Sequence, residues 1–258
     1  MCLSLPAGVA AFAVATGLED GLAGFEDSEA WVPRLSVLER LHLLILPGFA
    51  AILVLTLAAA FFSREPLRAR LGLVRPRGGW LPLPLYALSA PVAGAAGGLL
   101  AACFFEKSSP HVEALTALIT EPRGLTAVYV MLWISVAPGV VEELLYRGFV
   151  QQRLQRCWPA PLAVVVTGTA FAVAHFDPMH IVLVLPVGLW LSFVAWGTRS
   201  VVPSMVCHAT FNAGQMLAQR ATPEDGSVPP WLLVPLAAGF LAFAVSVPLL
   251  LRAGLRRP

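Results

Sequence analysis

The sequence predicts an all-α protein, a polytopic transmembrane helical bundle of about seven to eight helices. Three observations lead to this prediction. The chain of 258 residues is 58% hydrophobic and only 12% charged, whereas a soluble domain carries about 25% charged residues. Its apolar runs are continuous and rich in leucine and alanine, without the alternation of a membrane β-barrel. Seven of these runs approach the length that crosses a hydrocarbon core of ~30 Å.

The seven apolar runs follow one another with short polar connections. They cover 41–62, 81–105, 125–146, 160–176, 180–197, 201–219 and 231–251. Residues 1–40 precede them as an apolar and then acidic external segment, and 41–258 are expected to form a single transmembrane domain. Residues 1–17 lack an N-terminal lysine or arginine, which argues against a signal peptide and leaves open a short first membrane helix.

The basic residues orient the bundle, because cytoplasmic loops carry an excess of arginine and lysine. Twelve of the 17 basic residues fall in alternate connections and at the C-terminus, namely 63–80, 147–159, Arg199 and 252–257. The intervening connections hold the other five and most of the acids: 18–40, 106–124 and 220–230. We therefore expect a multi-pass protein of the inner (cytoplasmic) membrane with a cytoplasmic C-terminus.

Charge and cysteine content exclude other classes. A net charge of +2 without a basic stripe indicates no nucleic-acid partner. The lipid bilayer is an expected partner because the composition is that of a membrane protein. The four cysteines show neither a disulfide framework nor zinc-ribbon spacing. Cys207 beside His208 is a weak sign of a cysteine protease, since neighbouring helix positions point about 100° apart.

The most informative stretch is Glu142-Glu143-Leu-Leu-Tyr-Arg147-Gly, at the end of a hydrophobic run. Charged groups at bilayer depth cost at least ~2.5–3.5 kcal/mol each and are usually functional. Glu143 and Arg147 have the spacing and order that favour an i,i+4 ion pair. Glu142 is rotated about 100° away from this pair, which suits it to act as a general base on water. The alternative is that both acids cap or solvate a helix end.

Two later apolar segments each carry a polar residue pair four positions apart. Phe171 and His175 share a face at the end of 160–176, and His208 and Asn212 share a face inside 201–219. A His/Asn pair can donate two hydrogen bonds to a developing oxyanion, the electrostatic role that often contributes most to acyl transfer. Hydrogen bonding between membrane helices is the alternative role for this pair.

Together, the three elements resemble the motifs of the CPBP family of intramembrane glutamate endopeptidases, which includes the type II CAAX prenyl endopeptidase and bacterial homologues. The family pattern is EExxxR, FxxxH and HxxxN. Here it reads Glu142-Glu143-Leu-Leu-Tyr-Arg147, Phe171-Ala-Val-Ala-His175 and His208-Ala-Thr-Phe-Asn212. The resemblance covers about 130–215, and it places a catalytic core at about 125–219.

The resemblance implies an endopeptidase that hydrolyses a peptide bond in a membrane-associated protein or peptide, near the substrate's C-terminus. The implied roles are water activation by Glu142 with His175, oxyanion stabilisation by His208 and Asn212, and structural support by Glu143 and Arg147. No cofactor is expected. A zinc protease is the less favoured variant, with Glu142, His175 and His208 as the three protein ligands of a catalytic zinc.

A non-catalytic membrane scaffold or a transporter is the alternative from another class, because transporters also carry ionisable groups at the bilayer midplane. The chain shows no pair of repeated halves, and one carboxylate with two histidines and an asparagine suits hydrolysis better than ion coupling. The Ala-, Arg- and Pro-rich composition predicts a high-GC bacterium, in which prenylated CAAX proteins are not expected.

The expected topology sets one geometric condition. It puts Glu142 toward the cytoplasmic end of its helix and His175 toward the external end of the next, ~10–15 Å apart along the membrane normal. A helix break near Pro138, tilt, or a deeper start of 160–176 is needed to bring them together. Asp177 and His180 are expected to lie at the interface, outside the site.

Overall fold

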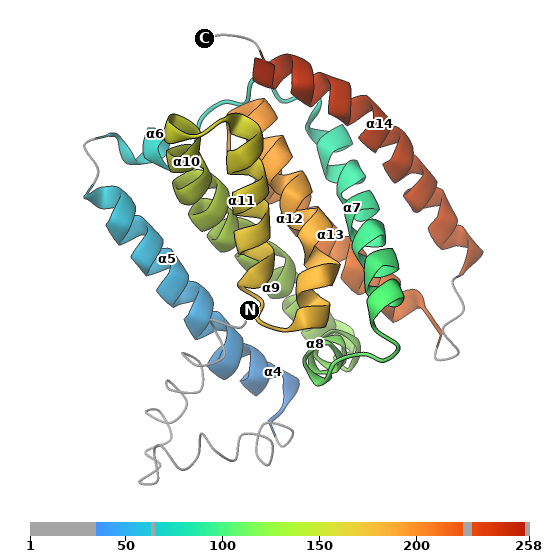
Figure 1. The fold of residues 1–258 in the computed structure, drawn as a ribbon. Coiled ribbons are helices and arrows are strands. Elements are labelled where there is room, and N and C mark those ends of the chain that lie inside the picture. The colour runs from blue at the N-terminus through green and yellow to red at the C-terminus, as the bar shows by residue number, and fades with distance from the viewer. Residues whose placement is uncertain (1–34, 63–64, 224–228, 256–258) are drawn as a thin grey trace, which may run out of the picture.

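A computed structural model describes residues 35–62, 65–223 and 229–255. In these ranges the chain is helical and forms no strand, which confirms the all-α prediction (Figure 1). Most of the predicted N-terminal segment lies outside the described residues. The elements are α4 (Val37–Glu39), η2 (Arg40–Ile45), α5 (Leu46–Phe61), α6 (Leu67–Arg70), α7 (Leu83–Phe104), α8 (Pro110–Thr120), α9 (Gly124–Glu143), η3 (Leu144–Gln151), α10 (Gln152–Cys157), α11 (Ala160–Val173), α12 (Pro178–Thr198), α13 (Val202–Ala221), η4 (Pro230–Leu232) and α14 (Leu233–Leu255).

Five helical stretches of the described chain are long and apolar enough to cross a membrane, as a polytopic bundle requires. They are Val37–Phe61, Leu83–Phe104, Gly124–Cys157, Pro178–Thr198 and Pro230–Leu255. The other two predicted runs form helices that fall short of the same measure. α11 has only 14 residues, and α13 carries histidine, asparagine and glutamine side chains along its length. These two helices hold the second and third motifs.

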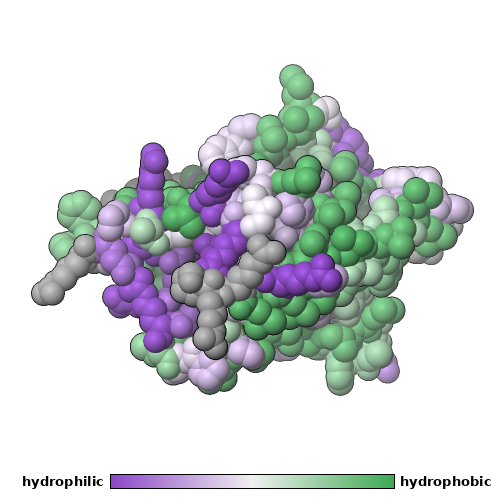
Figure 2. Space-filling view, turned by 90° about the horizontal axis from the view of Figure 1, so that it is seen from above, coloured by the Kyte–Doolittle hydropathy of each residue, from purple (hydrophilic) through white to green (hydrophobic). Residues whose placement is uncertain are grey.

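The arginine-rich connections lie together at one end of the bundle, where Figure 1 shows α6, α10 and the C-terminal end of α14. Backbone hydrogen bonds join the connections: Arg77 N donates to Thr198 O (2.7 Å) and Val201 N to Gly72 O (3.0 Å). Seen from this end, hydrophilic side chains gather over α6 and α10, and hydrophobic ones cover much of the rest (Figure 2). We call this the arginine-rich end.

α8 lies across the opposite end of the bundle (Figure 1) and is anchored at both of its termini. At its start, the Ser109 hydroxyl donates to Asp177 Oδ1 (3.0 Å), the residue that caps α12. At its end, the Arg220 guanidinium of α13 donates to Ile119 O (2.7 Å) and Pro122 O (2.8 Å). α8 is therefore fixed to α12 and α13, and we call this the α8 end.

The predicted boundary at residue 146 is wrong, because α9 continues through η3 and α10 to Cys157 as one stretch of 34 residues. Arg147 and Gln151 do not end the helix, since both side chains are buried inside the bundle. Glu142 consequently lies near the middle of this stretch. α11 then runs back beside it, and His175, which follows the last turn of α11, lines the same cavity as Glu142.

Two glycine contacts set the distances between the helices that carry the motifs. A Cβ atom on Gly188 of α12 would lie 2.6 Å from Gly168 O of α11. A Cβ atom on Gly139 of α9 would lie 3.1 Å from the backbone nitrogen of Ala209 on α13. Small residues allow membrane helices to approach this closely, so α9, α11, α12 and α13 form one tightly packed group.

Candidate active site

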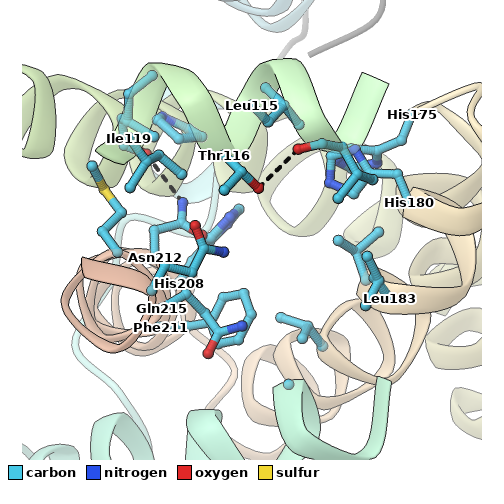
Figure 3. Close-up of a pocket in the computed structure, with 18 of the residues that line it drawn as sticks. Leu115, Thr116, Ile119, His175, His180, Leu183, His208, Phe211, Asn212 and Gln215 are labelled. Atoms are coloured by element: carbon cyan, nitrogen blue, oxygen red, sulfur yellow. Dashed lines mark hydrogen bonds between the residues drawn. The ribbon is translucent and has the colours of Figure 1, made fainter. Parts of the chain in front are cut away.

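A cavity of about 230 Å³ lies in the half of the bundle toward α8. Its walls come from α7, α8, α9 and α13, from the adjoining ends of α11 and α12, and from Phe49 of α5 (Figure 3). The cavity brings together all four residues for which a catalytic role is expected. They come from three separate segments: Glu142, His175, His208 and Asn212. Glu143 and Arg147 do not line the cavity, but are buried behind its wall.

The expected i,i+4 ion pair is present. Arg147 Nη1 lies 2.6 Å from Glu143 Oε1, and both side chains are fully buried. The guanidinium also donates to two groups of α12, Gly188 O (2.7 Å) and Ser192 Oγ (3.3 Å). Buried charges require this kind of pairing and hydrogen bonding, because each charge loses its hydration. Arg147 thus neutralises Glu143 of α9 and joins η3 to α12.

His208 is bound to the same carboxylate. Its Nδ1 lies 3.0 Å from Glu143 Oε1, and since a carboxylate paired with arginine accepts hydrogen bonds, Nδ1 carries the proton. The spacing of residues within either motif gives no sign of this contact, because it joins α9 to α13. It makes Glu143 a partner of the third motif as well as of Arg147.

The ring of His175 is oriented by the turn that precedes it. Nδ1 lies 3.0 Å from Phe171 O and 3.2 Å from Ala172 O. A carbonyl oxygen only accepts, so Nδ1 is the protonated nitrogen and Nε2 carries the lone pair. Phe171, the first residue of the FxxxH motif, separates the two histidines, with ring centroids 5.2 Å from His175 and 5.6 Å from His208.

Asn212 occupies a position created by the proline in α9. Pro138 has no N–H, so the carbonyl of Ile134, four residues earlier, lacks its helical donor. Asn212 Nδ2 donates to this Ile134 oxygen at 3.2 Å. An amide nitrogen has two protons, so the second proton of Asn212 remains for the cavity. The side chain therefore combines the helix-to-helix hydrogen bond foreseen as one alternative with a position in the cavity wall.

We expect the substitution Asn212→Ala to lower the free energy of unfolding by about 1–3 kcal/mol, because it leaves a buried carbonyl without a donor. The measurement is denaturant unfolding in detergent. In a Pro138→Ala background the amide of residue 138 supplies the missing helical donor, so the cost of Asn212→Ala should shrink by about 0.5 kcal/mol or more. Equal costs in both backgrounds would contradict this account.

His180 lies in the cavity wall, not at the interface as expected from the sequence. Its ring centroid is 4.3 Å from that of His175. The chain reaches this arrangement through Phe176, whose φ of 58° is rare for a bulky residue. Asp177 then begins α12 by accepting from His180 N at 2.7 Å. The sequence signal that could have placed His180 near His175 is the Asp177-Pro178 pair, which is typical of a helix start. It puts His180 in the first turn of the helix that follows His175.

A third histidine, His111 of α8, lies next to His180. The His111 ring centroid is 5.3 Å from that of His180, and burial lowers the pKa of the His111 imidazole. In the described part of the chain, no group of three or more His, Cys, Asp or Glu side chains is arranged to hold a metal ion. The histidines are thus grouped by ring contacts and not by a ligand shell.

Comparison with known proteins gives a match to a family model. Residues 124–214 match the family model described as type II CAAX prenyl endopeptidase Rce1-like. The matched range contains all three motifs. No curated protein and no solved structure matches the chain. The family resemblance read from the motifs is confirmed for this part of the chain, and it supports a protease embedded in a membrane.

Proposed function

From the match of residues 124–214 to the Rce1-like family, we propose that this chain is an intramembrane endopeptidase of the glutamate type. It hydrolyses a peptide bond in a membrane-associated protein or peptide, near the C-terminus of that substrate. The observation that carries the proposal is the convergence of Glu142, His175, His208 and Asn212 on one cavity. A scaffold does not require these four side chains to meet, and a transporter would require side chains that bind its cargo.

In the proposed reaction, Glu142 and His175 activate water. Glu142 accepts a proton as the water oxygen attacks the scissile carbonyl carbon, and the proton then passes to the leaving amine as the C–N bond breaks. His175 holds its Nδ1 proton on the Phe171 and Ala172 carbonyls. In the proposed reaction, its Nε2 atom, which carries the lone pair, accepts a hydrogen bond from the same water.

The oxyanion formed by this attack receives hydrogen bonds from His208 and Asn212. Asn212 supplies the Nδ2 proton that Ile134 does not use. His208 supplies a proton on Nε2, and the charge that the ring then carries is balanced by the Glu143 carboxylate at Nδ1. Donors fixed in this way act on the transition state without reorganising, which is why such sites are effective.

Comparison of new N-termini tests the proposal. Membranes from cells that express the protein are compared by mass spectrometry with membranes from cells that express the Glu142→Ala variant. We expect peptides whose new N-terminus lies near the end of a membrane protein, present only with the unaltered protein. Identical sets of N-termini in both samples would contradict proteolysis and favour the scaffold or transporter alternative.

The zinc variant of the mechanism predicts a different response to chelators. We expect the cleavage rate of the purified protein to be unchanged by 1,10-phenanthroline, because a Glu–His pair and a His–Asn pair together complete hydrolysis. The rate is measured on a peptide identified in the N-terminus comparison. Loss of activity that zinc restores would instead assign Glu142, His175 and His208 as metal ligands.

We also propose that the arginine-rich end faces the cytoplasm, as the positive-inside rule requires. Cys157 is exposed at that end, and Ser108 is exposed just before α8. In variants with one cysteine each, a membrane-impermeant maleimide applied to intact cells should label the Ser108→Cys variant and not Cys157. Permeabilised cells should label both. The reverse pattern in intact cells would invert the orientation.

A further inference from the structure

The polar face of α13 continues beyond the third motif. Gln215 and Gln219 follow Asn212 at spacings of three and four residues, which keeps all of them on one face of the helix. Both glutamines line the cavity together with His208 and Asn212, and both are exposed at the surface. At ~1.5 Å per residue, the row from 208 to 219 is about 16 Å long. We call these four residues the polar row.

The outer part of the polar row faces an opening between α7, α8 and α13. Gly98 of α7 lines the cavity and is itself exposed, and a Cβ atom placed on it would meet no atom within 4 Å. The neighbouring Gly97 differs, because its Cβ would collide with Leu183 O at 1.9 Å. Helix packing therefore explains Gly97 but not Gly98, whose missing side chain keeps the opening wide.

Across the cavity from the polar row, the walls are apolar and histidine-bearing. Figure 3 shows Gln215, Asn212 and His208 on one side, with His175 and His180 on the other. α8 contributes Leu115 and Ile119. In the described ranges, no lysine or arginine lines the cavity, so the wall offers no cation that would select an acidic side chain or a terminal carboxylate.

The glutamine amides have the chemistry of a peptide-backbone receptor. Among the described residues, the side-chain amides of Gln215 and Gln219 form no hydrogen bond. Each amide offers a donor and an acceptor, as does each main-chain peptide group. Their separation of one turn, about 6 Å, is close to the ~6.6–6.8 Å between alternate residues of an extended chain.

We propose that Gln215 and Gln219 bind the main chain of an extended peptide and lead it from the opening at Gly98 to His208 and Asn212. The inference rests on the proposed function, since it names the substrate of the same site. The substrate is a polypeptide segment in extended conformation, recognised through its backbone, with apolar side chains against α8. A lipid chain would fill the same volume but would have no use for the amides.

Peptide binding tests the proposal without requiring cleavage. The probe is a fluorescein-labelled alanine–leucine peptide of about eight residues, which is longer than the polar row when extended. Its binding to the detergent-solubilised Glu142→Gln variant is measured by fluorescence anisotropy. We expect Gln215→Leu and Gln219→Leu each to raise Kd by about 2- to 10-fold, the value of one net hydrogen bond. Gln155→Leu, a half-buried glutamine at the arginine-rich end, should leave Kd unchanged.

Two further measurements do not depend on the glutamine variants. The same peptide with N-methylated amide groups should bind more weakly than the unmethylated one to the parent Glu142→Gln protein. Gly98→Phe should weaken binding by closing the opening, whereas Gly214→Phe should not, since Gly214 also has open space at Cβ but does not line the cavity.

The proposal is overturned if the parent protein fails to bind the peptide, if N-methylation has no effect, or if the glutamine variants bind as the parent does. Cleavage by the unaltered protein is a separate observation. A protein that cleaves membrane proteins yet is indifferent to Gln215 and Gln219 keeps the proposed function and loses this inference. A protein that binds the peptide through the two glutamines but cleaves nothing keeps the peptide-binding role of the glutamines and loses the proposed function.

Discussion

The substitution Glu142→Gln is expected to lower the rate of peptide cleavage by about 10²–10⁴-fold, the contribution of a positioned general base. Glutamine keeps the size and hydrogen-bonding capacity of the side chain but cannot accept the proton from water. The rate is measured on purified protein with a substrate from the N-terminus comparison, and thermal unfolding is recorded in parallel. We expect the unfolding temperature to change little, because the hydrogen bonds that join Glu143 to Arg147 and to His208 remain in the variant.

Glu113→Gln is the matched control, since Glu113 is an exposed carboxylate on α8 at the same end of the protein and does not line the cavity. It should retain full activity. Cleavage by Glu142→Gln at the parent rate would show that Glu142 is not the general base, which is the role that the Rce1-like resemblance implies for it.

The substitution Arg147→Met is expected to lower the free energy of unfolding by about 3–5 kcal/mol, since it leaves the Glu143 charge buried without its main counter-charge. It also removes the hydrogen bonds to Gly188 and Ser192 of α12. The measurement is unfolding in mixed detergent micelles. In the double variant with Glu143→Leu, much of this loss should be recovered, because the buried Glu143 charge is removed together with its partner.

Arg156→Met serves as the control, because Arg156 forms an ion pair of the same 2.6 Å length with Glu65. That pair is about half exposed, so its loss should cost no more than about 1 kcal/mol. Equal effects of Arg147→Met and Arg156→Met would show that the buried cluster does not stabilise the bundle.

Much of the fold and the site is predictable from the sequence, because both depend on local patterns. Continuous apolar runs specify membrane helices, and a polar side chain inside such a run is expected to face the interior of the bundle. That reasoning identified Glu142, His175, His208 and Asn212, which the structure brings to one cavity. It also gave the ion pair between Glu143 and Arg147, since an i,i+4 contact is decided within one helix.

What the sequence did not reveal depends on contacts between helices. The hydrogen bond from His208 to Glu143 joins residues 65 positions apart. The hydrogen bond from Asn212 to Ile134 O replaces the helical N–H donor that Pro138 lacks. The end of the long helix was misplaced at residue 146 for the same reason. Arg147 and Gln151 resemble a helix end only until the neighbouring helices that enclose them are known.

The arrangement of polar bonds gives the cavity two unlike walls. On one side, Arg147 ties η3 to α12, Glu143 ties α9 to α13, and glycine contacts hold α11 against α12. Sliding these helices apart would expose charge to hydrocarbon. On the other side, α8 is hydrogen-bonded to its neighbours at its two termini and packs through apolar side chains between them. Bending of the α8 wall would therefore enlarge the cavity while the bonds among Glu143, Arg147 and His208 stay in place.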